Sequence, residues 1–218
     1  MARCIPGAEF VPLEGSAANL WEQDTAPVLA ALAEFLGLPT SIVPTARRRP
    51  GPPRTVVFTD LEGSTALLQE VGEGAFMELL AEHDTIIRRS LVRWRGREVK
   101  HTGDGIMASF VSTAGAVRCA IQIQRELDKH AQANPEHPLK VRVGAAAGEP
   151  VEQHNDLFGC TVQLAARLCA HAQPEQILVS NAIAELCIGK GLSFEDVGEV
   201  TLKGFGSPVR AHAAAWRL

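Results

Sequence analysis

The stretch that decides the fold lies at residues 54–65 and reads RTVVFTDLEGST. Residues 55–59 are all β-branched or aromatic, a composition that predicts a buried β-strand. Asp60 ends this strand, and Gly63-Ser64-Thr65 follows as a flexible turn whose hydroxyl groups suit the N-cap of a helix. The stretch therefore predicts a strand, an acidic loop and a helix start in immediate succession.

Outward from this stretch, the next segment has helical spacing. Apolar residues recur between positions 67 and 94 at intervals that suit a helix, and His83 occupies one of these positions. Gly72 and Gly74 interrupt the pattern. Because glycine weakens a helix interior, we expect two helical pieces rather than one.

The following segment predicts a β-hairpin with an acidic tip. Residues 98–102 and 106–111 flank Gly103-Asp104-Gly105, and Ser112 then opens a further helix that reaches residue 127. Together with the later elements, this order predicts an α+β sandwich, with helices on one face of a mostly antiparallel sheet. The later elements are strands at 141–143, 177–179, 194–197, 200–202 and 211–216 and a helix at 161–170.

The region before residue 54 has a different composition. Eight of the 13 prolines lie there, and the run RRRPGPP at 47–53 predicts a stiff linker, because such a run continues neither a helix nor a central strand. Ahead of it, residues 25–36 have helical spacing and residues 10–13 suit a short strand. We expect an N-terminal appendage at 1–46, a linker at 47–53 and a main domain at 54–218.

The overall composition is that of a globular chain. Of the 218 residues, 46% are apolar and 21% charged, and the mean hydropathy is +0.04. The net charge of −4 argues against a nucleic-acid partner, which would need a basic face. No apolar run approaches the ~18 residues that span a bilayer, and no signal pattern occurs, so we expect no membrane partner. Five widely spaced cysteines without a CxxC pair indicate reduced thiols in a cytoplasmic protein.

Two aspartates are candidates for metal binding. If the first strand and the hairpin are neighbours in the sheet, Asp60 and Asp104 reach the same edge. Such a carboxylate pair suits two hard divalent cations with phosphate ligands, and the helix start at Gly63-Ser64-Thr65 favours a polyphosphate. The alternative is that Asp60 caps a turn and Asp104 is an ordinary turn residue. The glycine loop between them favours the metal and phosphate interpretation.

Four segments resemble the catalytic domain of class III nucleotidyl cyclases. They are FTDLEGST at 58–65, KHTGDGIMA at 100–108, DLFGCTVQLAARL at 156–168 and LKGF at 202–205, in the order and spacing of that family. Four ordered motifs are a much stronger signal than one short match. The resemblance runs from residue 54 to the C-terminus and implies a ferredoxin-like sandwich with active sites at a dimer interface.

The resemblance also implies an activity and the residues that carry it. It implies an adenylate cyclase, which converts ATP to 3′,5′-cyclic AMP and pyrophosphate by attack of the ribose 3′-hydroxyl on the α-phosphate. Asp60, Asp104 and the carbonyl of Leu61 would bind two Mg²⁺ or Mn²⁺ ions. Arg167 would meet the charge that builds on the α-phosphate, and Lys203 would bind the outer phosphates. In the family these two groups come from the partner subunit, so a homodimer would share its sites.

Three further positions concern substrate recognition. Lys100 and Asp156 occupy the base-reading positions of the family, and a lysine donor with an aspartate acceptor suits N1 and the 6-amino group of adenine. The alternatives are an exposed strand lysine and a turn cap. Gln163 stands where the family usually has an asparagine that orients the ribose. Its amide lies about an ångström further out, which can cost ~100-fold, so the expected activity is weakened rather than absent.

Two alternatives complete the predictions. Residues 7–13 and 28–36 resemble the last strand and helix of an α/β-hydrolase, but the histidine expected after Gly15 is missing and no GxSxG elbow occurs. That resemblance implies a remnant without hydrolase chemistry, and an unrelated helical lead-in is the other interpretation. For the main domain, the alternative to an active enzyme is a catalytically silent nucleotide-binding or dimerisation module of the same fold.

Overall fold

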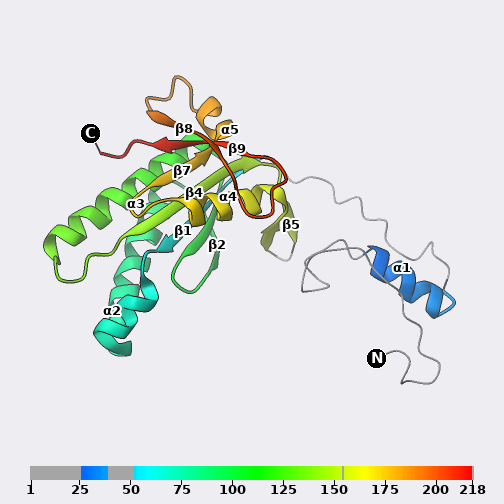
Figure 1. Ribbon diagram of the computed structural model, residues 1–218, viewed down its shortest axis with the longest axis horizontal. Helices are drawn as coiled ribbons and strands as arrows, with labels where there is room; N and C mark the ends of the chain where they lie inside the picture. Colours follow the sequence, from blue (N-terminus) through cyan, green and yellow to red (C-terminus); the bar gives the residue numbers. More distant parts are fainter. Residues whose placement is uncertain (1–25, 39–51, 154, 218) are drawn as a thin grey trace. The chain divides into compact units, whose positions relative to one another are not determined.

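The computed structural model describes residues 26–38, 52–153 and 155–217 (Figure 1). The chain divides into two compact units, Met1–Arg49 and Pro50–Leu218. In the first unit, helix α1 (Ala26–Phe35) matches the helix predicted there. The strand predicted at 10–13 and most of the proline-rich run lie outside the described residues. The predicted domain limits at 46 and 53 stay a prediction.

The second unit is built on a seven-stranded sheet with the order β2-β3-β1-β4-β7-β9-β8. Only the β4–β7 pair is parallel, and the other neighbours run antiparallel. The predicted α+β class with a mostly antiparallel sheet is therefore confirmed. The strands are β1 (Arg54–Leu61), β2 (Arg97–His101), β3 (Ile106–Phe110), β4 (Val141–Gly148), β7 (Ile177–Ser180), β8 (Phe194–Val200) and β9 (Val209–Ala214).

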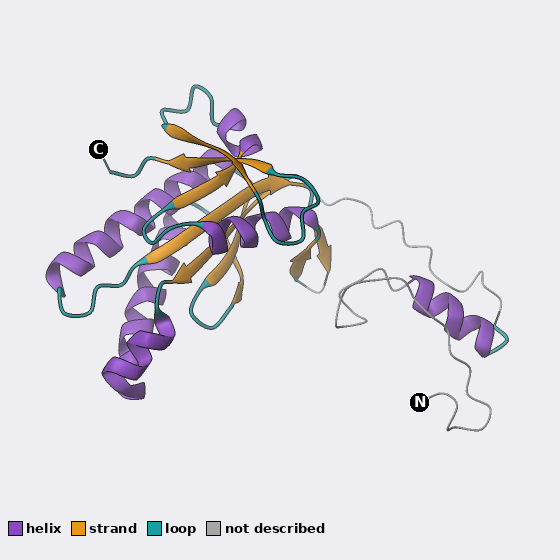
Figure 2. Ribbon diagram, in the orientation of Figure 1, coloured by secondary structure: helices purple, strands orange, loops and turns teal. Residues whose placement is uncertain are grey.

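Helices cover both faces of this sheet (Figure 2). Val57 packs in one buried cluster with residues of α2 (Ser64–Arg93), α3 (Thr113–Ala133) and α5 (Asn181–Leu186). Its neighbour Val56 points the other way, into a cluster with Ala165 of α4 (Cys160–His171). The position of α4 differs from the expectation that helices pack on one face. The reason is that β1 and β4 carry apolar side chains on both faces, which is typical of a strand buried on both sides.

The packing of α4 on β4 depends on a glycine. A Cβ atom on Gly144 would lie 2.0 Å from the backbone N of Cys169 and 2.4 Å from the carbonyl O of Ala165. Because no side chain fits into that space, the strand and the helix backbone can approach this closely only at a glycine. This contact sets the depth of α4 on the sheet and therefore the position of the residues that α4 presents to solvent.

Most local predictions are confirmed. The helix expected at 67–94 is α2, and its two pieces meet at Gly72, which has φ 80° and ψ 165°. The Ser112 side chain caps α3 by accepting from the backbone N–H of Gly115, at 3.1 Å. The strand predicted at 194–197 extends to Val200 as β8, through a register shift between Asp196 and Gly198. The separate strand predicted at 200–202 is wrong, because residues 201 and 202 are not in a strand. The sequence interpretation missed α5 and a small hairpin of β5 (Val151–Gln153) and β6 (Asp156–Phe158).

The cysteines of the described residues are mainly core residues. Cys119, Cys169 and Cys187 are buried, and Cys160 is exposed. Burial raises the pKa of the Cys119 and Cys169 thiols to about 12. These two side chains therefore stay protonated and unreactive at neutral pH. Within the described segments, no helix has both the length and the apolar character needed to cross a bilayer.

Candidate active site

The site lies where β1 ends beside the β2–β3 hairpin. The buried Thr59 hydroxyl accepts a hydrogen bond from the backbone N–H of Ile106 at 2.9 Å, which holds the two strands in register. Two residues further on, the Leu61 N–H donates to the carbonyl O of Asp104 at 3.0 Å. We expected Asp60 and Asp104 at one edge if the first strand and the hairpin are neighbours in the sheet. They are neighbours, since β1 and β3 pair antiparallel, and both aspartates lie at one edge.

Two glycines shape the hairpin tip. A Cβ atom on Gly105 would lie 2.0 Å from the carbonyl O of Thr59, so only glycine allows the tip to lie this close to β1. Gly103 has a φ of 101°, in the region that favours glycine. The predicted acidic tip between two glycines is confirmed, and its backbone explains why both flanking residues are glycine.

Each aspartate already has a partner within the chain. The Ser64 hydroxyl donates to Oδ2 of Asp104 at 2.5 Å. The guanidinium of Arg142, which stands directly opposite on β4, forms an ion pair with Oδ2 of Asp60. The Nε of Arg142 is buried and has no hydrogen-bond partner in the described part of the chain. The sequence interpretation missed Arg142, and the available signal was a charged residue within the apolar strand 141–143.

The helix start differs from the expectation in one respect. Gly63 is the N-cap of α2, with a φ of 66°, and no side chain caps this end. The Ser64 hydroxyl is not a cap because it is bound to Asp104. The first helical hydrogen bond runs from the Leu67 N–H to the Gly63 carbonyl, so the N–H groups before Leu67 have no acceptor within the helix. With Thr65 exposed in the first turn, this end of α2 favours an anion.

The residues at this edge fit a hard divalent cation. Carboxylate oxygens from Asp60 and Asp104 and a nearby main-chain carbonyl are the ligand type that Mg²⁺ and Mn²⁺ take, with water and phosphate oxygens completing the shell. Both side chains are half-buried, which leaves them accessible. Among the described residues, no group of three or more His, Cys, Asp and Glu side chains could hold a metal ion. Any cation here therefore depends on ligands beyond the protein's side chains.

Lys100 and Asp156 are brought together. Lys100 lies on β2 and Asp156 on β6, and Lys100 Nζ is 2.7 Å from Oδ2 of Asp156. The other carboxylate oxygen accepts from the Leu157 N–H at 2.7 Å, and the Phe158 ring lies 5.9 Å from Lys100 Nζ. The two residues expected to read the base thus form one exposed donor–acceptor pair beside an aromatic ring. The bond from the Leu157 N–H also fits the turn-cap alternative for Asp156, so both interpretations stay open.

Gln163, Arg167 and Lys203 lie at the surface. Gln163 and Arg167 are four residues apart on α4 and therefore share its solvent-facing side. Lys203 is exposed in a turn closed by the Phe205 N–H donating to the Leu202 carbonyl. Leu202 packs in the same cluster as residues of α4. None of the three polar side chains has a hydrogen bond or ion pair within the described part of the chain, so all three are available to a ligand or a second subunit.

A histidine–aspartate network supports the hairpin, and sequence reasoning missed it. Asp84 on α2 is bonded to Nδ1 of His83 at 3.1 Å and to Nε2 of His101 at 2.9 Å. Nδ1 of His101 accepts from the Gly103 N–H at 3.2 Å, next to Asp104. Burial alone would raise the pKa of Asp84, but the hydrogen bonds from His101 and His83 outweigh it and hold that pKa below its usual value. The network ties α2 to the loop that carries Asp104.

This geometry suits a ligand that carries phosphate groups and divalent cations. Two carboxylates at a strand end, a helix N-terminus that favours an anion, and a separate donor–acceptor pair for a base fit a nucleoside triphosphate with divalent cations. The chain belongs to the adenylate and guanylate cyclase catalytic domain family, whose model matches residues 49–215. The resemblance to nucleotidyl cyclases is confirmed.

Individual relatives agree with this assignment. The chain is 30% identical over 166 residues to a putative adenylate cyclase of Rhizobium meliloti, covering 74% of this chain and 27% of that protein. It is 36% identical over 154 residues to an uncharacterized protein of Mycobacterium tuberculosis, covering 71% and 39%. A solved adenylate cyclase structure from Trypanosoma brucei, described as monomeric, superposes with a TM-score of 0.67 at 25% identity, covering 78% and 92%. The chain thus spans well under half the length of these two curated relatives.

The buried His83 makes the stability of the domain depend on pH. Burial lowers the pKa of His83 below its ordinary 6.5, against the opposing effect of Asp84. As pH falls below 6.5, the unfolded chain binds a proton that the folded chain binds less readily, so the free energy of unfolding falls. We expect the chain with His83→Gln to lose less stability between pH 7.5 and 5.5, with a slope smaller by at most about 1.4 kcal/mol per pH unit. Urea unfolding at several pH values measures this.

The exposed His171 provides a matched control for that experiment. His171→Gln makes the same chemical change at the surface, outside the Asp84 network. If the chains with and without His83→Gln lose stability with the same slope, the role given to His83 is incorrect.

Proposed function

We propose that this chain is an adenylate cyclase that converts ATP to 3′,5′-cyclic AMP and pyrophosphate. The ribose 3′-oxygen forms a bond to the α-phosphorus, the bond from that phosphorus to the bridging oxygen of the β-phosphate breaks, and pyrophosphate leaves. The observation that carries the proposal is the Lys100–Asp156 pair, 2.7 Å apart, in a chain whose Asp60 and Asp104 share one sheet edge.

The pair supports ATP as the substrate because of the pattern of adenine. Adenine presents an acceptor at N1 and a donor at the 6-amino group, whereas guanine presents the reverse. Lysine has only donors and an ionised aspartate only acceptors, so the two side chains match adenine and not guanine. In the same position, guanine would place a donor against the donor Lys100 and an acceptor against the acceptor Asp156, and neither pair forms a hydrogen bond.

The charged residues would have separate roles in binding the metal ions and the phosphates. Asp60, Asp104 and the Leu61 carbonyl would hold two Mg²⁺ or Mn²⁺ ions, which when bound lower the pKa of the 3′-hydroxyl and neutralise the leaving pyrophosphate. Arg167 would stabilise charge on the α-phosphate, as a planar fork suits phosphate oxygens. Lys203 would bind the outer phosphates, and the first-turn N–H groups of α2 at Gly63-Ser64-Thr65 would add further donors.

We further propose that two copies share each site. Arg167, Gln163 and Lys203 are exposed and have no hydrogen bond or ion pair among the described residues, whereas Asp60 and Asp104 have internal partners. Exposed side chains of this kind suit a contribution to a site of a second copy. A homodimer of this kind would carry two equivalent sites.

The second candidate is a nucleotide-binding module without activity. It is favoured by the ion pair between Arg142 and Asp60, which a metal ion would have to compete with, and by Gln163 in place of the asparagine usual in the family. Such a module would bind ATP and release no cyclic product.

The decisive assay incubates the purified chain with ATP and MnCl2 and measures cyclic AMP and pyrophosphate. We expect product, with a loss of at least about 100-fold for Asp60→Asn and for Asp104→Asn, because each removes a charged metal ligand. Glu62→Gln is the matched control, since Glu62 is an exposed carboxylate next to the site. ATP binding without product would support the silent module, and faster turnover of GTP would contradict the role of Lys100 and Asp156.

Gln163 is expected to lower turnover without abolishing it. Gln163→Asn shortens the side chain by one methylene and should raise kcat or leave it unchanged, because the amide then lies closer to the ribose position. Steady-state kinetics with ATP measure this. A lower kcat in Gln163→Asn would show that the longer amide suits this site and that our account of the position is incorrect.

Sharing of the sites is tested by mixing two inactive chains. Asp60→Ala lacks a metal ligand and Arg167→Ala lacks the phosphate contact, so a heterodimer would contain one site with both residues intact. We expect the mixture to recover a fraction of the activity that neither variant shows alone. No recovery, when differently tagged chains are shown to exchange subunits, would contradict a shared site.

A further inference from the structure

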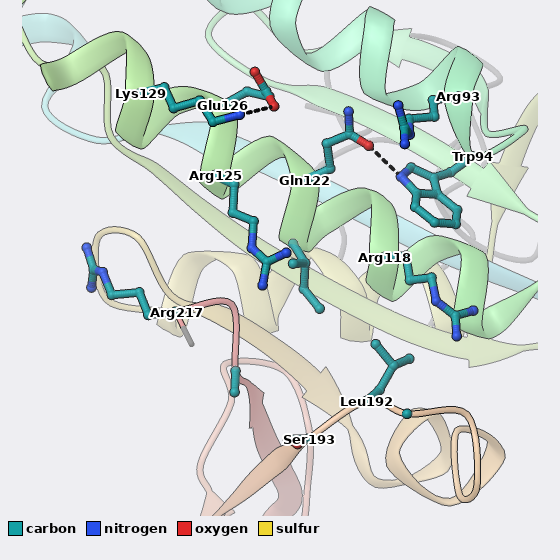
Figure 3. A pocket seen from close by; sticks show the side chains of 13 residues that line it. Arg93, Trp94, Arg118, Gln122, Arg125, Glu126, Lys129, Leu192, Ser193 and Arg217 are labelled. Carbon is teal, nitrogen blue, oxygen red and sulfur yellow. Dashed lines mark hydrogen bonds and ion pairs between the residues drawn. The ribbon is translucent and has the colours of Figure 1, made fainter. Parts of the chain in front are cut away.

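A basic pocket lies on the outer side of α3, and nothing in the proposed reaction uses it (Figure 3). It is a cavity of about 600 Å³ bounded by one side of α3, the C-terminal end of α2, the loop at 191–193 and the chain end at 215–217. It shares no residue with the candidate active site. Helix α3, which forms one wall of the pocket, covers one face of the sheet. Helix α4, which carries Arg167, covers the other face.

The pocket is positively charged in a chain that is acidic overall. It is lined by five basic side chains and one carboxylate, Glu126, whereas the whole chain has a net charge of −4. Glu126 is already paired with Lys129 at 3.0 Å. The basic residues are Arg93, Arg118, Arg125, Lys129 and Arg217.

Three of these guanidinium groups have no carboxylate partner among residues 26–38, 52–153 and 155–217. Arg118 donates through Nη2 to the Lys190 carbonyl at 2.6 Å, and Arg125 donates through Nε to the Trp216 carbonyl at 2.9 Å. Each bond holds its side chain in place and leaves the full positive charge uncompensated. Arg93 has neither a hydrogen bond nor an ion pair within the described residues. In Figure 3, Arg118 extends from α3 toward Leu192, whereas Arg125 extends toward the segment at 215–217 that accepts its hydrogen bond.

The pocket also has an apolar part. Ile121 and Leu192 line it together with the indole of Trp94. The Trp94 N–H is satisfied by Oε1 of Gln122 at 2.8 Å, so the ring itself is an apolar surface. The Arg118 guanidinium lies 5.9 Å from the centre of that ring. A ligand that satisfies this pocket therefore carries both negative charge and an apolar body.

We propose that this pocket binds an organic phosphate with an apolar or aromatic body. Arginine forks match phosphate oxygens, and a phosphate monoester carries nearly two negative charges at neutral pH, enough to offset several unpaired guanidinium groups. The apolar body packs on Trp94, Ile121 and Leu192. This ligand would bind at a place separate from the candidate active site, because the two share no lining residue.

The test titrates the full chain with 1-naphthyl phosphate in EDTA without added metal, and follows the Trp94 indole N–H signal by NMR. Trp94→Phe assigns that signal. We expect saturable binding, at least about tenfold tighter than inorganic phosphate, because the apolar body adds buried surface. Neutral 1-naphthol is expected to bind at least about tenfold more weakly than 1-naphthyl phosphate, because it lacks the charge. Binding of 1-naphthol as tight as that of the phosphate, or no shift of the Trp94 signal, would overturn the proposal.

Variants identify the site. Arg118→Gln with Arg125→Gln should weaken binding by at least about 50-fold, since each lost charged contact costs on the order of tenfold. Arg118→Lys keeps the charge and loses the fork, and should weaken binding by about tenfold even if the double variant folds poorly. Arg210→Gln removes an equal charge from a residue outside the pocket, and Lys203→Gln removes the proposed phosphate contact of the active site. Both should leave the affinity within about twofold, and an equal loss in either one would overturn the proposal.

Discussion

The candidate site depends on the register between β1 and β3. That register is held by the buried Thr59 hydroxyl, which accepts from the Ile106 N–H, and by the close approach of Gly105 to the Thr59 carbonyl. A slip of one residue would turn every side chain of β1 to the other face of the sheet and move Asp60 away from Asp104. The polar bond is strong here because it is buried, where an unpaired donor costs about 1–3 kcal/mol.

A strand buried on both faces organises the rest of the domain. β1 and β4 pack against α2 and α3 on one face and against α4 on the other, where Gly144 allows the backbones to meet. Asp60 follows Val56 and Phe58 on the face that α4 covers. Arg167 and Gln163 lie on the solvent-facing side of that helix. The exposure of these two side chains on α4 is the structural basis for proposing that a second subunit completes each site.

Charge is distributed unevenly over the domain. The net charge is −4, but five basic side chains and one carboxylate line the pocket beside α3. Within the site, each acidic side chain has a partner. Asp60 forms an ion pair with Arg142, Asp104 accepts a hydrogen bond from Ser64, and Asp84 is bonded to two histidines. An acidic chain can thus bind anionic ligands, because the local arrangement of charge and not its sum determines the potential at a site.

The sequence by itself determined the features that depend on neighbours along the chain. These are the β1 strand, the break in α2 at Gly72, the hairpin tip at Asp104, the Ser112 cap and the ordered motifs that place the chain in its family. Only the tertiary structure decided the ion pair of Asp60 with Arg142, the binding of Ser64 to Asp104, the network around Asp84 and the face on which α4 packs. Each of these joins side chains or elements brought together by strand register and helix packing. Local propensity and spacing carry no information on such contacts, because they arise only once distant segments have packed together.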